Sequence, residues 1–240
     1  MLLVSLAFFC GLASLGHCFS EQQSAKIEYT SAEADDPDYW NGIYHLHGLH
    51  GRTSYEWYGF GYKDLEDLVT QTLPNKGELL VVGAGDSELS AALWAAGRTV
   101  TSIDFSAYLV KKMKALYPWV PFHHMDARNT SFADGRFAAV LDKGLSDCLR
   151  DDDDLHRYFQ EMRRILRMPD GVLIVISMRP IEEENHLGSG WACEPRRGLQ
   201  GSLFQDVSEF SPAKPVLGTE GTIEYYLTVC RHVGDVPDEL

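Results

Sequence analysis

From residue 78 onward, short apolar runs alternate with segments of helical periodicity, and this alternation restricts the possible folds more than any other feature. The apolar runs predict strands over residues 79–82, 99–103, 121–124, 137–141 and 171–178. The helical spacing of apolar residues predicts helices over residues 62–73, 87–96, 106–117 and 151–168. Residues 222–231 alternate between apolar and polar, which favours a late antiparallel strand. Repeated strand–helix–strand units indicate an α/β domain with a doubly wound, mostly parallel sheet.

The charge balance of the chain restricts its partners. The 240 residues include 21 Lys and Arg and 35 Asp and Glu, which gives a net charge of −14 at pH 7. A negative field repels phosphate backbones, and the sequence has no basic patch, so we expect no nucleic-acid partner. Basic substrates such as lysine-rich protein segments are electrostatically easier to bind. The length suits one α/β domain with a full core.

The two ends of the chain differ from its middle. Residues 1–20 contain no Lys, Arg, Asp or Glu, and their apolar stretch over 2–15 is too short for an ordinary membrane span. We interpret residues 1–20 as a signal peptide, with an uncleaved hydrophobic anchor or a packed helix as alternatives, and we expect no stable membrane span. Residues 21–38 form an acidic linker, residues 39–233 the folded domain and residues 234–240 an acidic tail.

The predicted compartment follows from both ends. The last three residues, Asp-Glu-Leu, are those of the KDEL-type retrieval signal. We therefore expect the secretory pathway, in particular the endoplasmic reticulum lumen, with the cytoplasm as the alternative. Asn129 begins an N-glycosylation sequon, which has meaning only in that pathway. Outside the leader the cysteines are Cys148, Cys193 and Cys230, without a C-x-x-C spacing, which argues against a disulfide framework and a zinc site.

Suitable polar residues and glycines follow four of the predicted strands, where a doubly wound sheet binds its ligands. Residues 83–87, Gly-Ala-Gly-Asp-Ser, form a glycine loop, but Glu88 stands where a dinucleotide-binding motif has its third glycine. Nicotinamide chemistry is therefore disfavoured. Asp104 ends the second strand, where a carboxylate accepts hydrogen bonds from ribose hydroxyls. Asp126 ends the third strand, where it or a nearby backbone amide can recognise an adenine edge, or simply form a surface loop.

These loops occur together with aromatic residues at 39–40 and 55–58 and with Asp-Lys-Gly at 142–144. The set resembles the class I, seven-stranded S-adenosylmethionine-dependent methyltransferases similar to the elongation factor 1-alpha lysine methyltransferases. This group includes the methyltransferase-like domain associated with endothelin-converting enzyme. The resemblance covers roughly residues 39–231 and implies a Rossmann-like seven-stranded sheet and S-adenosylmethionine as cofactor.

The resemblance also implies the residues that bind the cofactor. Three aromatic residues close over it, namely Trp40, Tyr44 and Trp57. The glycine loop, through Gly83 and Gly85, holds its methionine part. The remaining implied contacts are Asp104 for the ribose with Phe105 beside it, Asp126 and Ala127 for the adenine, and Lys143 as part of the pocket wall.

Two departures from the family are visible. Ala84 stands where the family usually has Cys, and the spacing between Tyr44 and Trp57 is longer. In addition, the elongation factor is cytosolic, whereas this chain begins with an apparent leader. The expected activity is methyl transfer to a protein lysine. The alternatives are a small-molecule or thiol methyltransferase of the endoplasmic reticulum and a non-catalytic domain that retains the fold.

The sequence assigns no catalytic residue and no metal ligand. Asp142 and Asp147 are the acids nearest the expected methyl-transfer site. Asp142 is followed by Lys-Gly, whereas nucleic-acid amino-methyltransferases carry an Asn/Asp-Pro-Pro-aromatic motif after this strand, which disfavours that class. The run of four carboxylates at 151–154 is interpreted as the N-terminus of a helix, because adjacent side chains do not converge on one metal ion.

Overall fold

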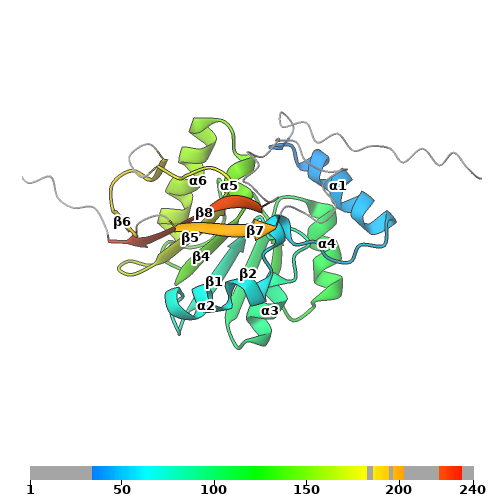
Figure 1. Cartoon of the computed structure of the whole chain (residues 1–240), viewed down its shortest axis with the longest axis horizontal. Coiled ribbons are helices and arrows are strands. Elements are labelled where there is room, and N and C mark those ends of the chain that lie inside the picture. The colour runs from blue at the N-terminus through cyan, green and yellow to red at the C-terminus, as the bar shows by residue number, and fades with distance from the viewer. Residues whose placement is uncertain (1–33, 183–185, 195–196, 203–221, 234–240) are drawn as a thin grey trace, which may run out of the picture.

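The computed structural model describes residues 34–182, 186–194, 197–202 and 222–233 (Figure 1). The predicted leader, most of the predicted linker and the acidic tail lie outside these residues. Helix α1 (Pro37–Leu49) begins two residues before the predicted start of the domain, with Asp36 as its N-cap. No helix of the described part is long and apolar enough to cross a membrane.

The sheet has the predicted doubly wound arrangement. Its order is β3-β2-β1-β4-β5-β8-β6, and the first five of these strands are parallel. The strands of the parallel part are β1 (Glu78–Val82), β2 (Thr99–Asp104), β3 (Phe122–His124), β4 (Ala139–Lys143) and β5 (Val172–Ser177). The fourth strand starts two residues later than predicted because the backbone of Phe137 bonds instead to Ile165 and Arg167, next to the end of helix α6 (Asp152–Ile165).

The antiparallel end of the sheet is built around β8 (Thr222–His232). One edge of β8 pairs with β5, as predicted for a late antiparallel strand. Its other edge is divided between β6 (Trp191–Cys193), which pairs with residues 230–232, and β7 (Arg197–Ser202), which pairs with residues 222–227. The described sheet therefore has eight strands, with two short strands sharing one position of a seven-stranded order.

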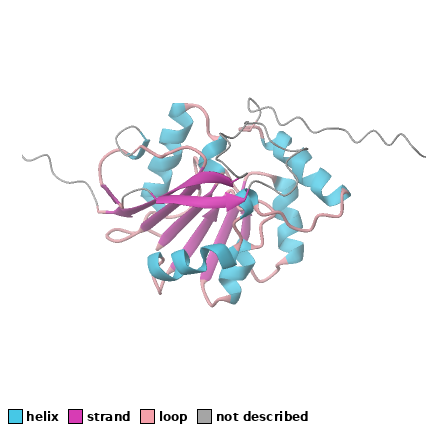
Figure 2. Cartoon of the chain, viewed as in Figure 1, coloured by secondary structure: helices cyan, strands magenta, loops and turns pink. Residues whose placement is uncertain are grey.

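Helices cover both faces of the sheet (Figure 2). Those not yet given are the 3₁₀ helix η2 (Trp57–Gly59), α2 (Tyr62–Thr72), α3 (Leu89–Ala95), α4 (Ala107–Leu116) and α5 (Leu145–Cys148). Ser106 is the N-cap of α4, a position that favours serine. Its hydroxyl oxygen accepts a hydrogen bond from the N–H of Leu109 over 3.1 Å. Asp151 caps α6 by accepting from the N–H of Asp153, so the acidic run is a helix N-terminus as interpreted from the sequence.

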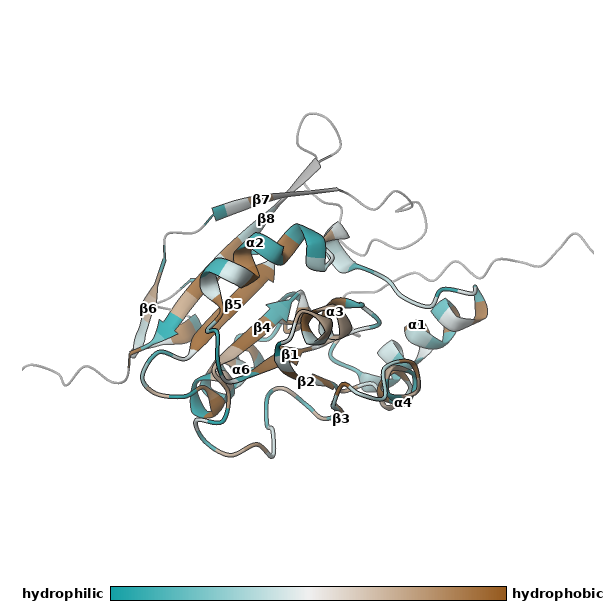
Figure 3. Ribbon diagram, turned by 90° about the horizontal axis from the view of Figure 1, so that it is seen from below, coloured by the Kyte–Doolittle hydropathy of each residue, from teal (hydrophilic) through white to brown (hydrophobic). Residues whose placement is uncertain are grey.

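Alternate residues of the strands enter two separate cores. Leu79 and Val81 of β1 pack with α2, α3 and α4 on one face, whereas Leu80 and Val82 pack with α6 on the other. This alternation is the period of two that a strand imposes. Figure 3 shows the hydrophobic colour gathered on the central strands. Helix α1 lies beside α4, at the end of the sheet where the parallel strands terminate (Figure 1).

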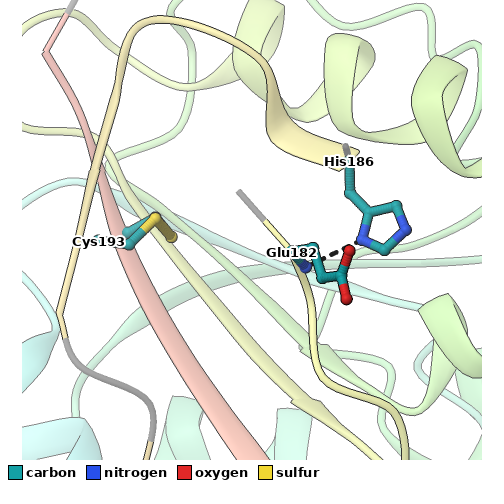
Figure 4. The surroundings of a disulfide bond; sticks show 4 residues. Glu182, His186 and Cys193 are labelled. Atoms are coloured by element: carbon teal, nitrogen blue, oxygen red, sulfur yellow. Dashed lines mark hydrogen bonds between the residues drawn. A yellow bond between two sulfur atoms is a disulfide. The ribbon is translucent and has the colours of Figure 1, made fainter. Parts of the chain in front are cut away.

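The cysteine spacing argued against a disulfide framework, but the structure contains a disulfide bond. Cys193 and Cys230 are bonded to each other, and Cys148 is the free cysteine of the described part (Figure 4). The two bonded residues are direct partners in the antiparallel register of β6 and β8. Their proximity arises from a pairing between residues 37 positions apart, which no local cysteine spacing reveals. Cys230 is buried in the core and is also a bridged residue.

Candidate functional site

The carboxylate of Asp104 connects the end of β2 to the loop that follows β1. Asp104 accepts a hydrogen bond of 3.0 Å from the N–H of Gly85 and one of 2.9 Å from the N–H of Ser106. Parallel pairing of β1 and β2 brings the two loops side by side. Burial raises the pKa of Asp104 to about 6. The predicted ribose acid therefore lies next to the predicted glycine loop.

The two glycines of this loop need their small size for different reasons. Both have positive φ, 53° at Gly83 and 59° at Gly85, a region that favours glycine. A Cβ on Gly83 would stand 2.9 Å from the Cβ of Leu145. A Cβ on Gly85 would stand 3.3 Å from the hydroxyl of Tyr44 and 3.6 Å from Nε1 of Trp57. The loop is thus enclosed by α5 on one side and by aromatic residues on the other.

The three predicted aromatic residues form one cluster. Trp40 stacks on Tyr44 with ring centroids 5.8 Å apart, and it meets Trp57 edge-on at 5.7 Å. Helix α1 carries the first two and is fixed to α4 by Asn41, whose side-chain oxygen accepts from the hydroxyl of Ser106 over 2.7 Å. The longer spacing between Tyr44 and Trp57 therefore still brings both side chains to the glycine loop.

Asp86 of the glycine loop anchors the loop to two helices. Its Oδ2 lies 2.9 Å from Nδ1 of His47 in α1 and 3.2 Å from Nζ of Lys112 in α4. Asp86 is fully buried, so these partners offset the free energy of burying its charge. Its backbone oxygen also accepts from the N–H of Tyr55 over 3.1 Å. The sequence analysis named Asp86 only as a member of the loop and missed this role.

The predicted adenine contacts lie after β3, close to Asp104. The N–H of Met125 donates to the backbone oxygen of Asp104, so the next residues continue from the same edge. The carboxylate of Asp126 is bonded to Arg128, which lowers the pKa of Asp126 despite its partial burial. Arg128 therefore occupies both carboxylate oxygens of Asp126, and the backbone oxygen of Asp126 accepts from the N–H of Asn129. Ala127 is buried in the α6-side core.

Phe105, the remaining residue of the ribose side, immediately follows β2. Its backbone oxygen lies 2.9 Å from Nε2 of His124, the last residue of β3. This contact ties the end of β2 to the end of β3, where both predicted ribose and adenine residues stand. The structure thus brings Phe105 and Asp104 together at one edge of the sheet.

Lys143, at the end of β4, is buried and has two hydrogen-bond partners. Its Nζ donates to Oε2 of Glu56 over 2.6 Å and to the backbone oxygen of Phe60 over 2.7 Å. Burial lowers the pKa of Lys143, while the charge of Glu56 opposes that change. Glu56 also accepts from the hydroxyl of Ser87 and the N–H of Glu88. Lys143 therefore fixes the segment before α2 to the end of β4, and Glu56 fixes the same segment, with Trp57, to the glycine loop.

The two acids after β4 have different environments. Asp142 accepts from the N–H groups of Leu145 and Ser146 and from the hydroxyl of Tyr158 over 2.9 Å. Burial raises the pKa of Asp142 to about 7, and its bonds hold the start of α5. Asp147 instead accepts from the hydroxyl of Tyr58 over 2.5 Å. Sequence reasoning missed Tyr58 and Glu56, although both lie in the aromatic segment 55–58 that it singled out.

The described residues contain no group of three or more His, Cys, Asp or Glu side chains that could hold a metal ion. What the site does contain is a glycine loop, a buried ribose-type acid on the neighbouring strand, and aromatic rings over the loop. This donor set fits a nucleoside that carries an amino-acid part. Asp104 matches the ribose hydroxyls, and the small residues of the loop leave its backbone open to a close approach.

Comparison with known proteins agrees with this geometry. Residues 80–175 match the family described as "Methyltransferase domain". The chain is 32% identical over 196 residues to the eEF1A lysine and N-terminal methyltransferase of Xenopus laevis, covering 75% of this chain and 28% of that protein. It is 36% identical over 115 residues to the bovine EEF1A lysine methyltransferase 4, covering 46% of this chain and 44% of that protein. The chain thus spans less than half the length of these relatives.

Solved structures show the same fold. A SAM-dependent methyltransferase from Methanosarcina mazei superposes with a TM-score of 0.55 at 14% identity, covering 69% of this chain and 97% of its own. The geranyl diphosphate C-methyltransferase of Streptomyces coelicolor, solved with S-adenosyl-L-homocysteine, superposes with a TM-score of 0.55 at 16% identity. That match covers 87% of this chain and all of the other, so the likeness extends over most of the domain.

Proposed function

We propose that the chain is a class I S-adenosylmethionine-dependent methyltransferase and that the acceptor of its methyl group is the side-chain amine of a protein lysine. The names of the relatives support this acceptor, since they describe eEF1A lysine methyltransferases. The net charge of −14 favours approach of a basic protein segment. The observation that carries the proposal is the enclosed loop at Gly85, with Asp104 bonded to it and Tyr44 and Trp57 beside it.

The residues of the site divide the work of holding cofactor and acceptor. Bound S-adenosylmethionine would supply an electrophilic methyl group for transfer to the acceptor nitrogen. Asp104 binds the ribose hydroxyls, and the loop at Gly83 and Gly85 receives the methionine part. Trp40, Tyr44 and Trp57 shield the loop from water, which favours an aligned reaction over side reactions.

The aromatic cover is held in place by ionic and polar contacts outside the cofactor site. Lys143 and Ser87 both donate to Glu56, which precedes Trp57 in the chain. Asp86 binds His47, one turn beyond Tyr44 on α1. The cover is therefore fixed from both of its segments, so we assign Lys143 and Asp86 to positioning the cover.

The proposed compartment is the secretory pathway, in particular the endoplasmic reticulum lumen. Two features of the described residues support it. Disulfides such as Cys193–Cys230 persist in oxidising compartments and are rare in the cytosol. Asn129, the sequon residue, is exposed and so accessible to a glycan. In that compartment the acceptor lysine belongs to a luminal or secreted protein.

A glycosylation assay tests the compartment. The full chain is expressed in mammalian cells, and its mobility is compared before and after treatment with a glycosidase that removes N-glycans. We expect a shift that the Asn129→Gln variant lacks, together with protection of the chain from protease in intact microsomes. Protease digestion of the chain in intact microsomes would place it in the cytoplasm.

The acceptor is tested by product analysis. The purified enzyme is incubated with methyl-labelled S-adenosylmethionine and, in parallel, with eEF1A, poly-L-lysine and a small thiol, 2-mercaptoethanol. Hydrolysis of the labelled protein is expected to release methylated lysine, and the Asp104→Ala variant to give none. Label found only in the thioether of 2-mercaptoethanol would show a thiol methyltransferase, and label in neither eEF1A nor poly-L-lysine despite cofactor binding would contradict the proposed lysine acceptor.

A further inference from the structure

Four consecutive residues, 55–58, connect separate parts of the site, and we call them the strap. Tyr55 donates its N–H to the glycine loop at Asp86, and Glu56 binds Lys143 at the end of β4. Trp57 lies against Gly85. Tyr58 reaches furthest, to α5 and β8. The strap therefore joins the cofactor loop to a second cluster of polar groups beyond β4.

Tyr58 is held in an unusual conformation. Its φ is 66°, a region that few residues other than glycine adopt, and such residues cluster at functional sites. Its hydroxyl donates to Oδ2 of Asp147 over 2.5 Å. A Cβ on Gly144 would stand 2.7 Å from this hydroxyl, so the glycine after Lys143 makes room for it. The positive φ of Tyr58 and the absence of a Cβ at Gly144 therefore both allow the hydroxyl of Tyr58 to contact Asp147.

Asp147 has one engaged oxygen and one without a hydrogen bond. Oδ2 also accepts from the N–H of Met178 over 2.7 Å, at the end of β5. Oδ1 is buried and has no hydrogen-bond partner among the described residues. Oδ1 forms an ion pair with Arg179, whose Nε lies 3.7 Å away, and the charge and backbone N–H of Arg179 oppose the rise in the pKa of Asp147 that burial causes. A buried oxygen of this kind needs an explanation in a native structure, and a missing ligand is one.

Tyr225 of β8 completes the cluster. Its ring stacks on Tyr58 with centroids 4.5 Å apart and an interplanar angle of 30°, and Phe60 meets it edge-on at 5.4 Å. Tyr225 is fully buried, and its hydroxyl has no hydrogen-bond partner among the described residues. Two buried polar atoms without a hydrogen bond, Oδ1 of Asp147 and the hydroxyl of Tyr225, thus belong to residues that contact Tyr58.

We propose that Asp147, Tyr58 and Tyr225 form the site that receives the acceptor amine and that Oδ1 of Asp147 accepts its proton. This inference rests on the proposed lysine acceptor. Aromatic faces and a carboxylate are the groups that attract an ammonium ion. The cluster follows β4, and the strap connects it to the glycine loop, where the methyl donor is expected to bind. Tyr58 is a positioning residue, since it acts on the amine through Asp147.

The proton step balances within this cluster. The ammonium gives one proton to Oδ1 of Asp147, which leaves a neutral amine with a free lone pair and a carboxylic acid. Burial raises the pKa of Asp147, which makes it a better proton acceptor than an exposed aspartate. The charged and titratable groups facing it are Tyr58 from the strap, Asp142 from β4, Cys148 from α5, Arg179 after β5 and Tyr225 from β8.

Substitution of the carboxylate by its amide tests the inference. Asp147→Asn keeps an oxygen for the bonds from Tyr58 and Met178 but cannot take the proton. We expect kcat with poly-L-lysine or eEF1A to fall by about 100-fold or more, the range of general-base catalysis. The calorimetric Kd for S-adenosylhomocysteine should stay within about twofold of wild type, since the cofactor contacts are elsewhere. Asp67→Asn, an exposed acid on α2, is the control and should change neither value.

Two further readouts separate a site from a structural role. Tyr58→Phe keeps the ring stack and should lower kcat with a shifted pH profile, whereas loss of a merely structural bond would lower the melting temperature alone. Calorimetric titration with Nα-acetyl-lysine methylamide, in the presence of S-adenosylhomocysteine, should detect binding at least tenfold tighter than for the uncharged norleucine analogue. Asp147→Asn should abolish this difference.

These experiments distinguish failure of this inference from failure of the proposed function. A wild-type enzyme that methylates lysine, with an Asp147→Asn variant of unchanged rate and pH profile, would overturn the inference and leave the proposed function standing. A wild-type enzyme that binds the cofactor but labels no lysine would overturn both. Lysine methylation that fails in Asp147→Asn with cofactor binding and melting temperature intact supports both.

Discussion

The backbone N–H of Gly85 donates a 3.0 Å hydrogen bond to the carboxylate of Asp104, so the glycine loop and the acid on the next strand define each other's position. The same acid accepts from Ser106 at the start of α4. One carboxylate thus fixes two loops and remains the group expected to bind ribose. Substitutions at either end of this bond should therefore act on cofactor affinity before they act on the fold.

Gly85→Ala should weaken the binding of S-adenosylhomocysteine by at least tenfold. The added methyl would press on the hydroxyl of Tyr44, 3.3 Å away, and displace the aromatic cover. Gly97→Ala is the matched control, because Gly97 also has a positive φ, 82°, but has open space around its missing Cβ. Both variants should lose about 1–2 kcal/mol of stability through the left-handed backbone. Equal cofactor affinities in the two variants, measured by calorimetry, would contradict the role of the cover.

Cofactor affinity should fall as the pH is lowered through about 6. The pKa of Asp104 is raised to about 6 by burial, so the carboxylate is ionised above this pH and protonated below it. The ionised form accepts stronger hydrogen bonds from hydroxyl groups. Calorimetric titrations between pH 5 and pH 8 check this, with Asp104→Asn expected to bind weakly at every pH. A wild-type affinity that is flat over this range would show that Asp104 does not contact the cofactor.

Glu56 and Lys143 should be energetically coupled in cofactor binding. Their 2.6 Å ion pair holds the strap, and Lys143 is buried while Glu56 is partly exposed. In a double-mutant cycle with Glu56→Gln and Lys143→Met, contacting residues of this kind give coupling energies of about 0.5–3 kcal/mol. The readout is the Kd for S-adenosylhomocysteine in all four proteins. Strictly additive effects would mean that the pair does not hold the cover.

Reduction of the Cys193–Cys230 bond should destabilise the protein. The bond closes a loop of 37 residues and joins β6 to β8, and such bonds contribute about 2–4 kcal/mol. Urea unfolding with and without dithiothreitol measures the difference, and the Cys193→Ala/Cys230→Ala double variant should be insensitive to the reductant. A non-reducing digest analysed by mass spectrometry should show the two cysteine peptides linked. Unlinked peptides from protein made in the secretory pathway would be evidence against the bond.

Much of the fold could be predicted because several of its central strands are continuous apolar runs. Residues 79–82 and 171–178 carry enough local signal to place β1 and β5, and Ser106 marks the start of α4 through its capping side chain. Helix α1 was not predicted, because aromatic, histidine and glycine residues interrupt its apolar pattern. Strand β6 has only three residues and β7 is mostly polar with two glycines, so their pairing with β8 defines both.

The candidate site also has a part that the sequence predicts and a part that it does not. The glycine loop and Asp104 were predicted because they directly follow apolar strands. The contact between Tyr58 and Asp147 spans 89 positions, and Cys193 meets Cys230 through strand register, so neither pair leaves a local pattern. The sequence does contain one local signal: Glu56 is an acidic residue between two aromatic residues, which a purely apolar core segment would not contain.

The central claim is that this chain binds S-adenosylmethionine at the ends of β1 and β2. The most direct measurement is calorimetric titration of the wild-type protein and the Asp104→Ala variant with S-adenosylmethionine and S-adenosylhomocysteine. We predict one binding site for each ligand in the wild type and at least tenfold weaker binding in the variant, with both proteins folded by circular dichroism. The absence of binding to folded wild-type protein would contradict the claim.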